Sequence, residues 1–112
     1  MILKSIKHFK ELHKLKKGYI IEYNDNKTEN PFEDTIKYAF VMDIKYNYKK
    51  QMYIKCAFLS KAEIKKKQIV DAWNYDDFFI KSQKFFIKCK HFKVLGDYKD
   101  LNFMIFSDYT HF

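Results

Sequence analysis

An uninterrupted two-residue alternation runs through the middle of the chain, from Ile36 to Tyr46. One face of such a strand would carry the apolar residues Ile36, Tyr38, Phe40, Met42, Ile44 and Tyr46. The other face would carry Lys37, Ala39, Val41, Asp43 and Lys45. Successive side chains of a strand point to opposite faces, so this pattern predicts a strand with one buried face and one solvated face.

The same alternation resumes after a lysine-rich turn at residues 48–51. Its apolar positions are Met52, Ile54, Cys56 and Phe58. The two segments together predict an antiparallel hairpin whose apolar faces meet the same core.

Residues 2–17 have helical spacing. The residues that gather on one side are Ile2, Ile6, Phe9, Leu12 and His13. Lysines lie mostly opposite, which predicts an amphipathic N-terminal helix that ends at Gly18. Residues 19–24 then predict a strand, and residues 25–35, which contain Asn30-Pro31, predict an exposed loop.

A capping box predicts where the next helix begins. In Ser60-Lys61-Ala62-Glu63, the serine and glutamate side chains satisfy each other's exposed backbone amides. The helix therefore begins at Ser60.

Residues 76–94 fit two interpretations. A helix would place Phe78, Phe85, Cys89 and Phe92 on one stripe, whereas strands would alternate from Phe85 to Phe92. The helix is favoured because Asp76 and Asp77 suit a helix N-terminus and Gly96 suits its end. Residues 101–107 are apolar nearly throughout and predict a central or well-covered strand.

The length of 112 residues fits one domain. We therefore expect a single α+β domain over residues 1–112. It would have an N-terminal amphipathic helix, an antiparallel sheet of about four strands, and helical cover from residues 61–94.

The formal net charge of +8 comes from 22 lysines, without a single arginine. Abundant Asn, Lys, Ile, Tyr and Phe indicate an AT-rich genome, so part of this excess reflects codon bias. A basic chain favours nucleic acid, a nucleoprotein complex or an acidic protein surface as partner. Lysine can neutralise phosphates as a point charge, whereas arginine is the better reader of guanine.

Several classes of site are disfavoured. Cys56 and Cys89 lack CxxC spacing and predict reduced, buried thiols. The four histidines lack the spacing of a metal site, and no glycine-rich phosphate loop is present, so we expect no metal and no cofactor. The apolar runs are too short to span a bilayer, so we expect a cytoplasmic protein, in the host cytoplasm if viral, without membrane contact.

One group of three charged residues could form a catalytic site. Asp43 and Lys45 fall on one strand face, and Glu22 comes from a neighbouring strand, so the three could hold Mg²⁺ and polarise water. The order helix–strand–strand–strand–helix resembles the core of restriction-type nucleases. That family places its acid-x-lysine motif on the following strand, where Tyr53-Ile54-Lys55 lacks the acid. Charged residues on a solvated sheet face explain so short a motif better.

A second resemblance involves Gly18-Tyr19-Ile20-Ile21 and Ala57-Phe58-Leu59-Ser60-Lys61. These segments resemble the opening of small SH3-like barrel toxins that cleave RNA. The resemblance implies RNA cleavage, for which that family uses an arginine. This chain would need a lysine in its place.

Lysines and aromatic residues gather in two places. The hairpin tip carries Tyr46, Tyr48, Lys49, Lys50 and Tyr53, and the second helix carries Lys61, Lys65, Lys66 and Lys67. Exposed aromatic rings beside cations form binding platforms for single-stranded nucleic acid, although a solvated charged face has the same composition.

The leading hypothesis is a non-catalytic binding protein, an accessory protein of a virus or mobile element. It would occupy nucleic acid or a nucleoprotein complex such as a host-defence nuclease, as inhibitors of the anti-CRISPR type do. Two alternatives stay open: a small Mg²⁺-dependent nuclease or RNA-cleaving toxin, and a structural protein that forms a homo-oligomer through its aromatic residues.

Overall fold

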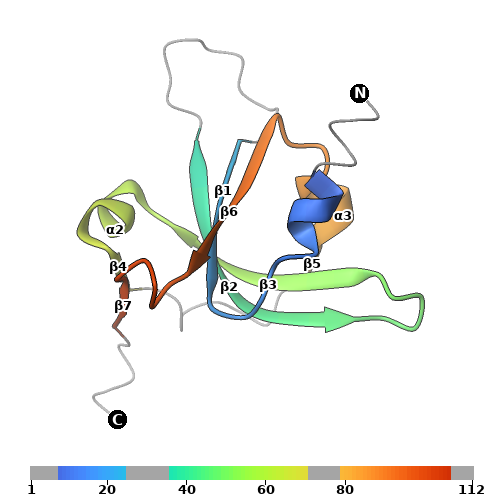
Figure 1. The fold of residues 1–112 in the computed structure, drawn as a ribbon, viewed down its shortest axis with the longest axis horizontal. Coiled ribbons are helices and arrows are strands. Elements are labelled where there is room, and N and C mark those ends of the chain that lie inside the picture. Colours follow the sequence, from blue (N-terminus) through green and yellow to red (C-terminus); the bar gives the residue numbers. More distant parts are fainter. Residues whose placement is uncertain (1–7, 25–35, 71–78, 107–112) are drawn as a thin grey trace.

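A five-stranded antiparallel sheet, in the order β5-β3-β2-β1-β6, forms the body of the protein (Figure 1). The computed structural model describes residues 8–24, 36–70 and 79–106. The sheet strands are β1 (Tyr19–Asn24), β2 (Lys37–Tyr46), β3 (Met52–Leu59), β5 (Ile80–Lys81) and β6 (His91–Asp97). A separate parallel pair joins β4 (Gln68–Ile69) to β7 (Met104–Ile105). The helices of the described part are short: residues 8–12, α2 (Lys61–Lys66) and α3 (Ser82–Phe86).

The predicted fold, with a long N-terminal amphipathic helix and helical cover, is wrong, because the described part is mostly sheet. Residues 1–7 of the predicted helix lie outside the described residues, and the rest is helical only over residues 8–12. The backbone then tightens into a turn, in which the Leu15 amide donates to the Leu12 carbonyl at 3.1 Å. Next, the Gly18 amide donates to the Val41 carbonyl at 2.8 Å, so pairing with β2 replaces further helix. Short helices are marginal by themselves, and tertiary pairing decides where this one ends.

The predicted helical cover over residues 61–94 is also wrong. α2 has six residues and α3 has five, residues 71–78 lie outside the described part, and the strand β6 begins at His91. Phe86, Cys89 and Phe92 nevertheless all lie buried in one core cluster. A turn of helix followed by a strand edge buries the same residues as a long helix would, so the apolar spacing did not distinguish the two.

The C-terminal strand is shorter than expected and is not central. β7 comprises only Met104 and Ile105, and 61% of Met104 is exposed. The tail from residue 107 onward lies outside the described residues, as does the predicted loop at residues 25–35.

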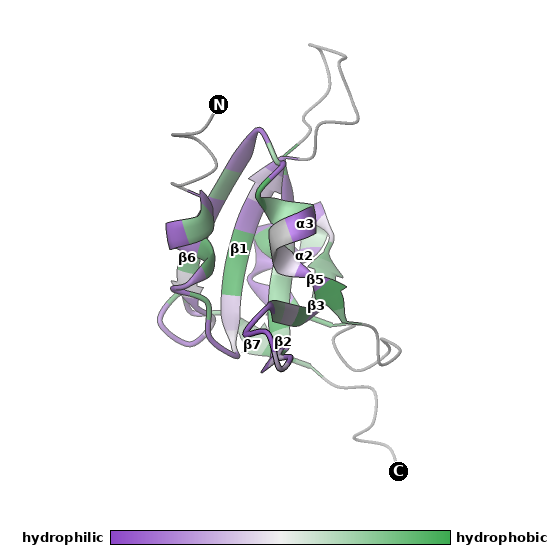
Figure 2. Ribbon diagram, turned by 90° about the vertical axis from the view of Figure 1, so that its right-hand side faces the viewer, coloured by the Kyte–Doolittle hydropathy of each residue, from purple (hydrophilic) through white to green (hydrophobic). Residues whose placement is uncertain are grey.

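The antiparallel pairing of the predicted hairpin is confirmed, but its two predicted apolar faces do not meet one core. Phe40 and Met42 lie in one cluster, whereas Met52, Ile54 and Cys56 lie in the other. β2 and β3 pair antiparallel from Tyr38 opposite Leu59 to Tyr46 opposite Met52, and β1 has the predicted bounds. The middle of β1 is hydrophobic (Figure 2), and it lies between β2 and β6.

The prediction of one buried face on β2 is wrong, because the sheet is covered on both faces. Ala39 and Val41 belong to a cluster covered by the helix at residues 8–12 and by α3, with Leu12 and Phe86 among its members. Phe40 belongs to a second cluster on the other face, which includes Ile20, Ala57 and Ile69. The segments around β4 and β7 cover that face.

A bulge in β2 also interrupts the predicted alternation. The register with β3 shifts between Val41 and Asp43, and beyond the shift Ile44 packs against the same cluster as Val41. Asp43 and Lys45 are exposed as a result, and Tyr46 is 57% exposed. One extra residue in a strand exchanges its two faces, which a two-residue pattern cannot show.

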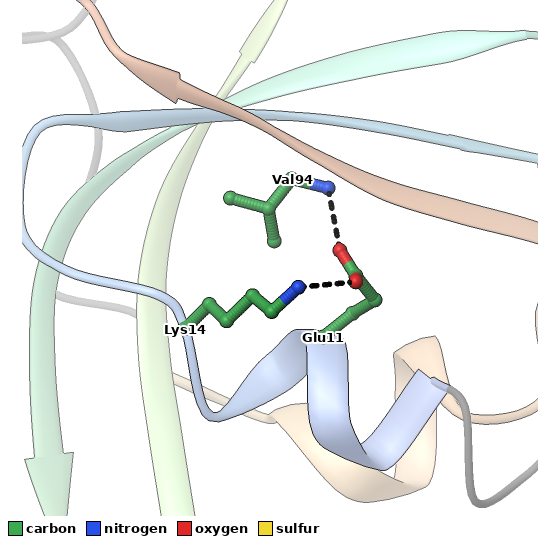
Figure 3. A network of polar contacts seen from close by, with 3 residues as sticks. All are labelled: Glu11, Lys14 and Val94. Carbon is green, nitrogen blue, oxygen red and sulfur yellow. Dashed lines mark hydrogen bonds and ion pairs between the residues drawn. The ribbon is translucent and has the colours of Figure 1, made fainter.

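A side chain of the first helix closes part of the outer edge of β6 (Figure 3). Glu11 Oε2 accepts a hydrogen bond from the Val94 amide at 3.4 Å, and Lys14 Nζ donates to Glu11 Oε1 at 2.9 Å. Blocking edge amides in this way hinders pairing with another chain.

Candidate nucleic-acid interface

The tip of the β2–β3 hairpin is braced by Asn47. Its Oδ1 accepts from the amides of Lys49 at 3.0 Å and Gln51 at 2.9 Å, and its Nδ2 donates to Gln51 Oε1 at 2.9 Å. The Lys50 amide donates to the Asn47 carbonyl at 2.9 Å, and Lys50 has a left-handed φ of 60°. An asparagine that holds its own turn in this way presents the tip residues in one fixed arrangement.

The braced tip carries exposed aromatic rings beside cations. Tyr48 is 88% exposed and Tyr46 is 57% exposed. Lys49 Nζ lies 5.6 Å from the centroid of the Tyr48 ring, and Lys49 and Lys50 are both exposed. The structure therefore brings together the binding residues predicted at the tip.

The fifth of these residues, Tyr53, lines a hollow of about 450 Å³ at the base of the tip. The hollow is also lined by Lys45, Tyr46, Asn47 and Phe79. Lys45 Nζ lies 4.1 Å from the centroid of the Phe79 ring, a cation–π contact between β2 and the residue that precedes β5.

A larger groove adjoins this hollow and shares Lys45 and Phe79 with it. Its volume is about 710 Å³. Its charged lining residues are four lysines and two aspartates: Lys17, Lys45, Lys55, Lys99, Asp43 and Asp97. Its aromatic lining residues are Phe40, Phe79 and Tyr98. The hollow and the groove thus form one continuous, predominantly basic surface.

The second predicted group of lysines lies elsewhere. Lys61, Lys65, Lys66 and Lys67 are exposed on and just after α2, at the opposite end of β3 from the tip (Figure 1). At about 3.3 Å per residue, the length of β3 separates the two groups by roughly 23 Å. The predicted capping box is confirmed: Glu63 donates its amide to Ser60 Oγ at 3.1 Å, and Glu63 Oε1 accepts from the Ser60 amide at 3.0 Å.

The three candidate catalytic residues do not come together. Asp43 and Lys45 line the groove, but Glu22 lies opposite Tyr38, five positions along β2 from Asp43, or roughly 17 Å. Glu22 Oε1 lies 2.6 Å from His91 Nε2 instead. Within the described ranges, no group of three acidic, histidine or cysteine residues is placed to hold a metal ion.

Both cysteines are buried free thiols, as predicted. Burial raises the pKa of the Cys56 thiol to about 12, so this thiol is a packing residue and not a nucleophile at neutral pH. The two segments that resemble RNA-cleaving toxins form the entry into β1 and the junction of β3 with α2.

Five groove residues escaped the sequence reasoning: Lys17, Lys55, Phe79, Tyr98 and Lys99. They come from segments far apart in the chain, and each is an ordinary residue in its local pattern. Pairing of β1 with β6 places Lys17, Tyr98 and Lys99 at one side of the depression, and pairing of β3 with β2 and β5 places Lys55 and Phe79 at the other.

Comparison with protein families, with curated proteins and with solved structures gave no match. In the described part of the chain, the helices are too short or too polar for any of them to cross a membrane.

Proposed function

We propose that this is a non-catalytic binding protein that holds single-stranded nucleic acid along the tip of the β2–β3 hairpin. The observation that carries the proposal is the pair of exposed rings, Tyr46 and Tyr48, beside Lys49 and Lys50 on a braced turn. Bases stack on exposed aromatic rings with about 1–3 kcal/mol per base, while cations contact the phosphates. An unpaired strand offers both groups at once, whereas a duplex hides its base faces.

The charge of the chain supports backbone binding without sequence reading. Lysine is a point charge that neutralises phosphates, and arginine, which makes paired contacts to guanine, is absent from the sequence. Stacking is likewise tolerant of sequence, because every base has a π face.

The lysines of α2 supply a second contact for longer strands. Lys61, Lys65, Lys66 and Lys67 lie roughly 23 Å from the tip, so a short oligonucleotide cannot contact both groups. A protein that binds a strand at these two places acts by covering its ligand, without catalysis. This fits an accessory protein of a virus or mobile element in the cytoplasm, which covers nucleic acid free or exposed in a nucleoprotein complex.

Fluorescence anisotropy of a labelled single strand of about twelve nucleotides tests the proposal. Tyr48→Ala should weaken binding about 5- to 150-fold, the equivalent of about 1–3 kcal/mol. Lys49→Gln with Lys50→Gln should reduce the slope of log K against log salt by about 1.4, since each phosphate contact to a single strand contributes about 0.7. A duplex of the same length should bind less tightly than the single strand.

Lys65→Gln with Lys66→Gln is the matched control, because it removes the same charge at the far end of β3. With an oligonucleotide of about four nucleotides, this control should bind as the unmodified protein does, while the tip variants lose affinity. Equal losses in both variants would mean that net charge alone attracts the strand. If Tyr48→Ala bound the strand as tightly as the unmodified protein, the proposed stacking of bases on Tyr48 would be wrong.

A further inference from the structure

The groove beside the hairpin has a rigid aromatic wall. The Tyr98 ring packs edge-on against Phe40, with centroids 5.5 Å apart and planes at 76°. Gly18 lies directly beside this ring, and a β-carbon at Gly18 would lie 3.4 Å from Tyr98 Cδ1. Gly18 also has a φ of +95°, so both its backbone and the ring beside it favour glycine there.

Backbone hydrogen bonds fix the same wall on both sides. The Tyr98 amide donates to the Gly18 carbonyl at 2.9 Å, and the Phe103 amide donates to the Tyr98 carbonyl at 2.8 Å. Met42 and Ile105 complete an apolar lining next to the ring. A wall held in this way is preformed, so a flat ligand would bind without the cost of ordering it.

Lysines dominate the charge around this apolar wall. Lys17 and Lys99 are exposed at the groove, and Lys55 is partly buried in its lining. One oxygen of each lining aspartate accepts from a backbone amide: Asp97 Oδ1 from Lys99 at 2.8 Å, and Asp43 Oδ1 from Ile44 at 2.9 Å. With four lysines against two aspartates, the lining has an excess of positive charge that complements an anion.

The size of the groove suits a small ligand. A volume of about 710 Å³ falls within the roughly 300–1,000 Å³ of small-molecule sites. The groove also shares Lys45 and Phe79 with the hollow beneath the hairpin tip, so a strand stacked on Tyr46 can continue into it.

We infer that this groove is a nucleotide subsite that receives one nucleotide of the bound strand. Its base lies against the Tyr98 wall, and its phosphate lies beside Lys17 and Lys99. The inference rests on the proposed function and adds to it a site at which a single nucleoside monophosphate is recognised.

Nuclear magnetic resonance titration with adenosine 5′-monophosphate tests the subsite on the full chain. Saturable shifts are expected at the amides of Gly18 and Tyr98. Lys17→Gln with Lys99→Gln should weaken monophosphate binding roughly fivefold or more, the loss expected when contacts to a charged group are removed. Both lysines are exposed, so this variant should unfold at the same temperature as the unmodified protein. Lys10→Gln with Lys90→Gln removes the same charge at exposed positions outside the groove, so this control should bind the monophosphate normally.

Adenosine and inorganic phosphate, titrated separately, should each bind more weakly than the monophosphate, because each contacts only one part of the groove. Absent or unsaturable shifts at Gly18 and Tyr98, or an equal loss in the control variant, would overturn the subsite. If the oligonucleotide still binds through Tyr48 in that case, the proposed function stands alone. Failure of the oligonucleotide itself to bind would overturn the proposed function, and with it the assignment of the groove to a strand.

Discussion

Glu63 ties α2 to the strand that follows it, and its replacement should loosen that corner of the protein selectively. Glu63 Oε1 accepts from the Ser60 amide at 3.0 Å, and Glu63 Oε2 accepts from the Val70 amide at 2.9 Å. One carboxylate therefore satisfies an amide at the start of the helix and another beyond β4. Both oxygens are needed, because the two amides lie on different segments.

The contacts set the expected size of the effect. Glu63→Ala removes both acceptors, and the loss of a helix cap of about 0.5–2 kcal/mol adds to the loss of a second charge-assisted bond. Because Glu63 is partly exposed, water compensates in part, and we expect a total of about 2 kcal/mol. Glu63→Gln keeps one oxygen but turns an N–H₂ group toward the other amide, so it should cost about 1 kcal/mol. Ser60→Ala, which removes only the acceptor for the Glu63 amide, should also cost about 1 kcal/mol.

Urea unfolding followed by circular dichroism measures these free energies, provided that the denaturant slope stays constant. Amide hydrogen exchange then locates the effect. The Met104 amide donates to the Lys67 carbonyl at 2.9 Å and the Phe106 amide to the Ile69 carbonyl at 2.8 Å, so both should exchange faster in Glu63→Ala, together with the Val70 amide.

Glu11 is the matched control. Its carboxylate holds an ion pair with the exposed Lys14 and a long, 3.4 Å contact to the Val94 amide, so Glu11→Ala should cost less than about 1 kcal/mol. The reasoning is refuted if Glu63→Ala costs no more than Glu11→Ala, or if the protection of Val70 is unchanged.

Two further predictions concern the hairpin and the core. Lys50 has a left-handed φ of 60° at the hairpin tip, so Lys50→Gly should raise the free energy of unfolding, measured in urea, by about 0.5–1 kcal/mol. The same change removes a cation and should weaken oligonucleotide binding. A loss of stability would show that this turn is not strained. Burial raises the pKa of the Cys56 thiol from 9.0 to about 12, so the contribution of the protonated thiol to stability is complete below pH 9.0 and decreases as the pH rises toward 12. Cys56 should accordingly stay unreactive toward a disulfide reagent at about pH 8 until the chain is unfolded, and rapid labelling of the folded protein would contradict its burial.

Part of the candidate site could be predicted from the sequence, and part could not. The tip residues Tyr46, Tyr48, Lys49 and Lys50 are neighbours in the chain, and a hairpin keeps them together, so local reasoning found them. The groove residues Lys17, Tyr98 and Lys99 were missed, because they meet only through pairing between β1 and β6. Glu22 was grouped with Asp43 because it was expected on a neighbouring strand, but the register places Glu22 opposite Tyr38.

Short-range chemistry in the sequence was enough to determine the β2–β3 hairpin, the bounds of β1, and the start of α2 at its capping box. Each depends on residues within a few positions of one another, where alternation and capping act directly. The tertiary structure decided the length of the first helix, the strand at residues 91–97 and the burial of both faces of β2. These features depend on which backbone amides find partners across the sheet and on one bulge that exchanges the faces of a strand, and neither leaves a periodic trace in the sequence.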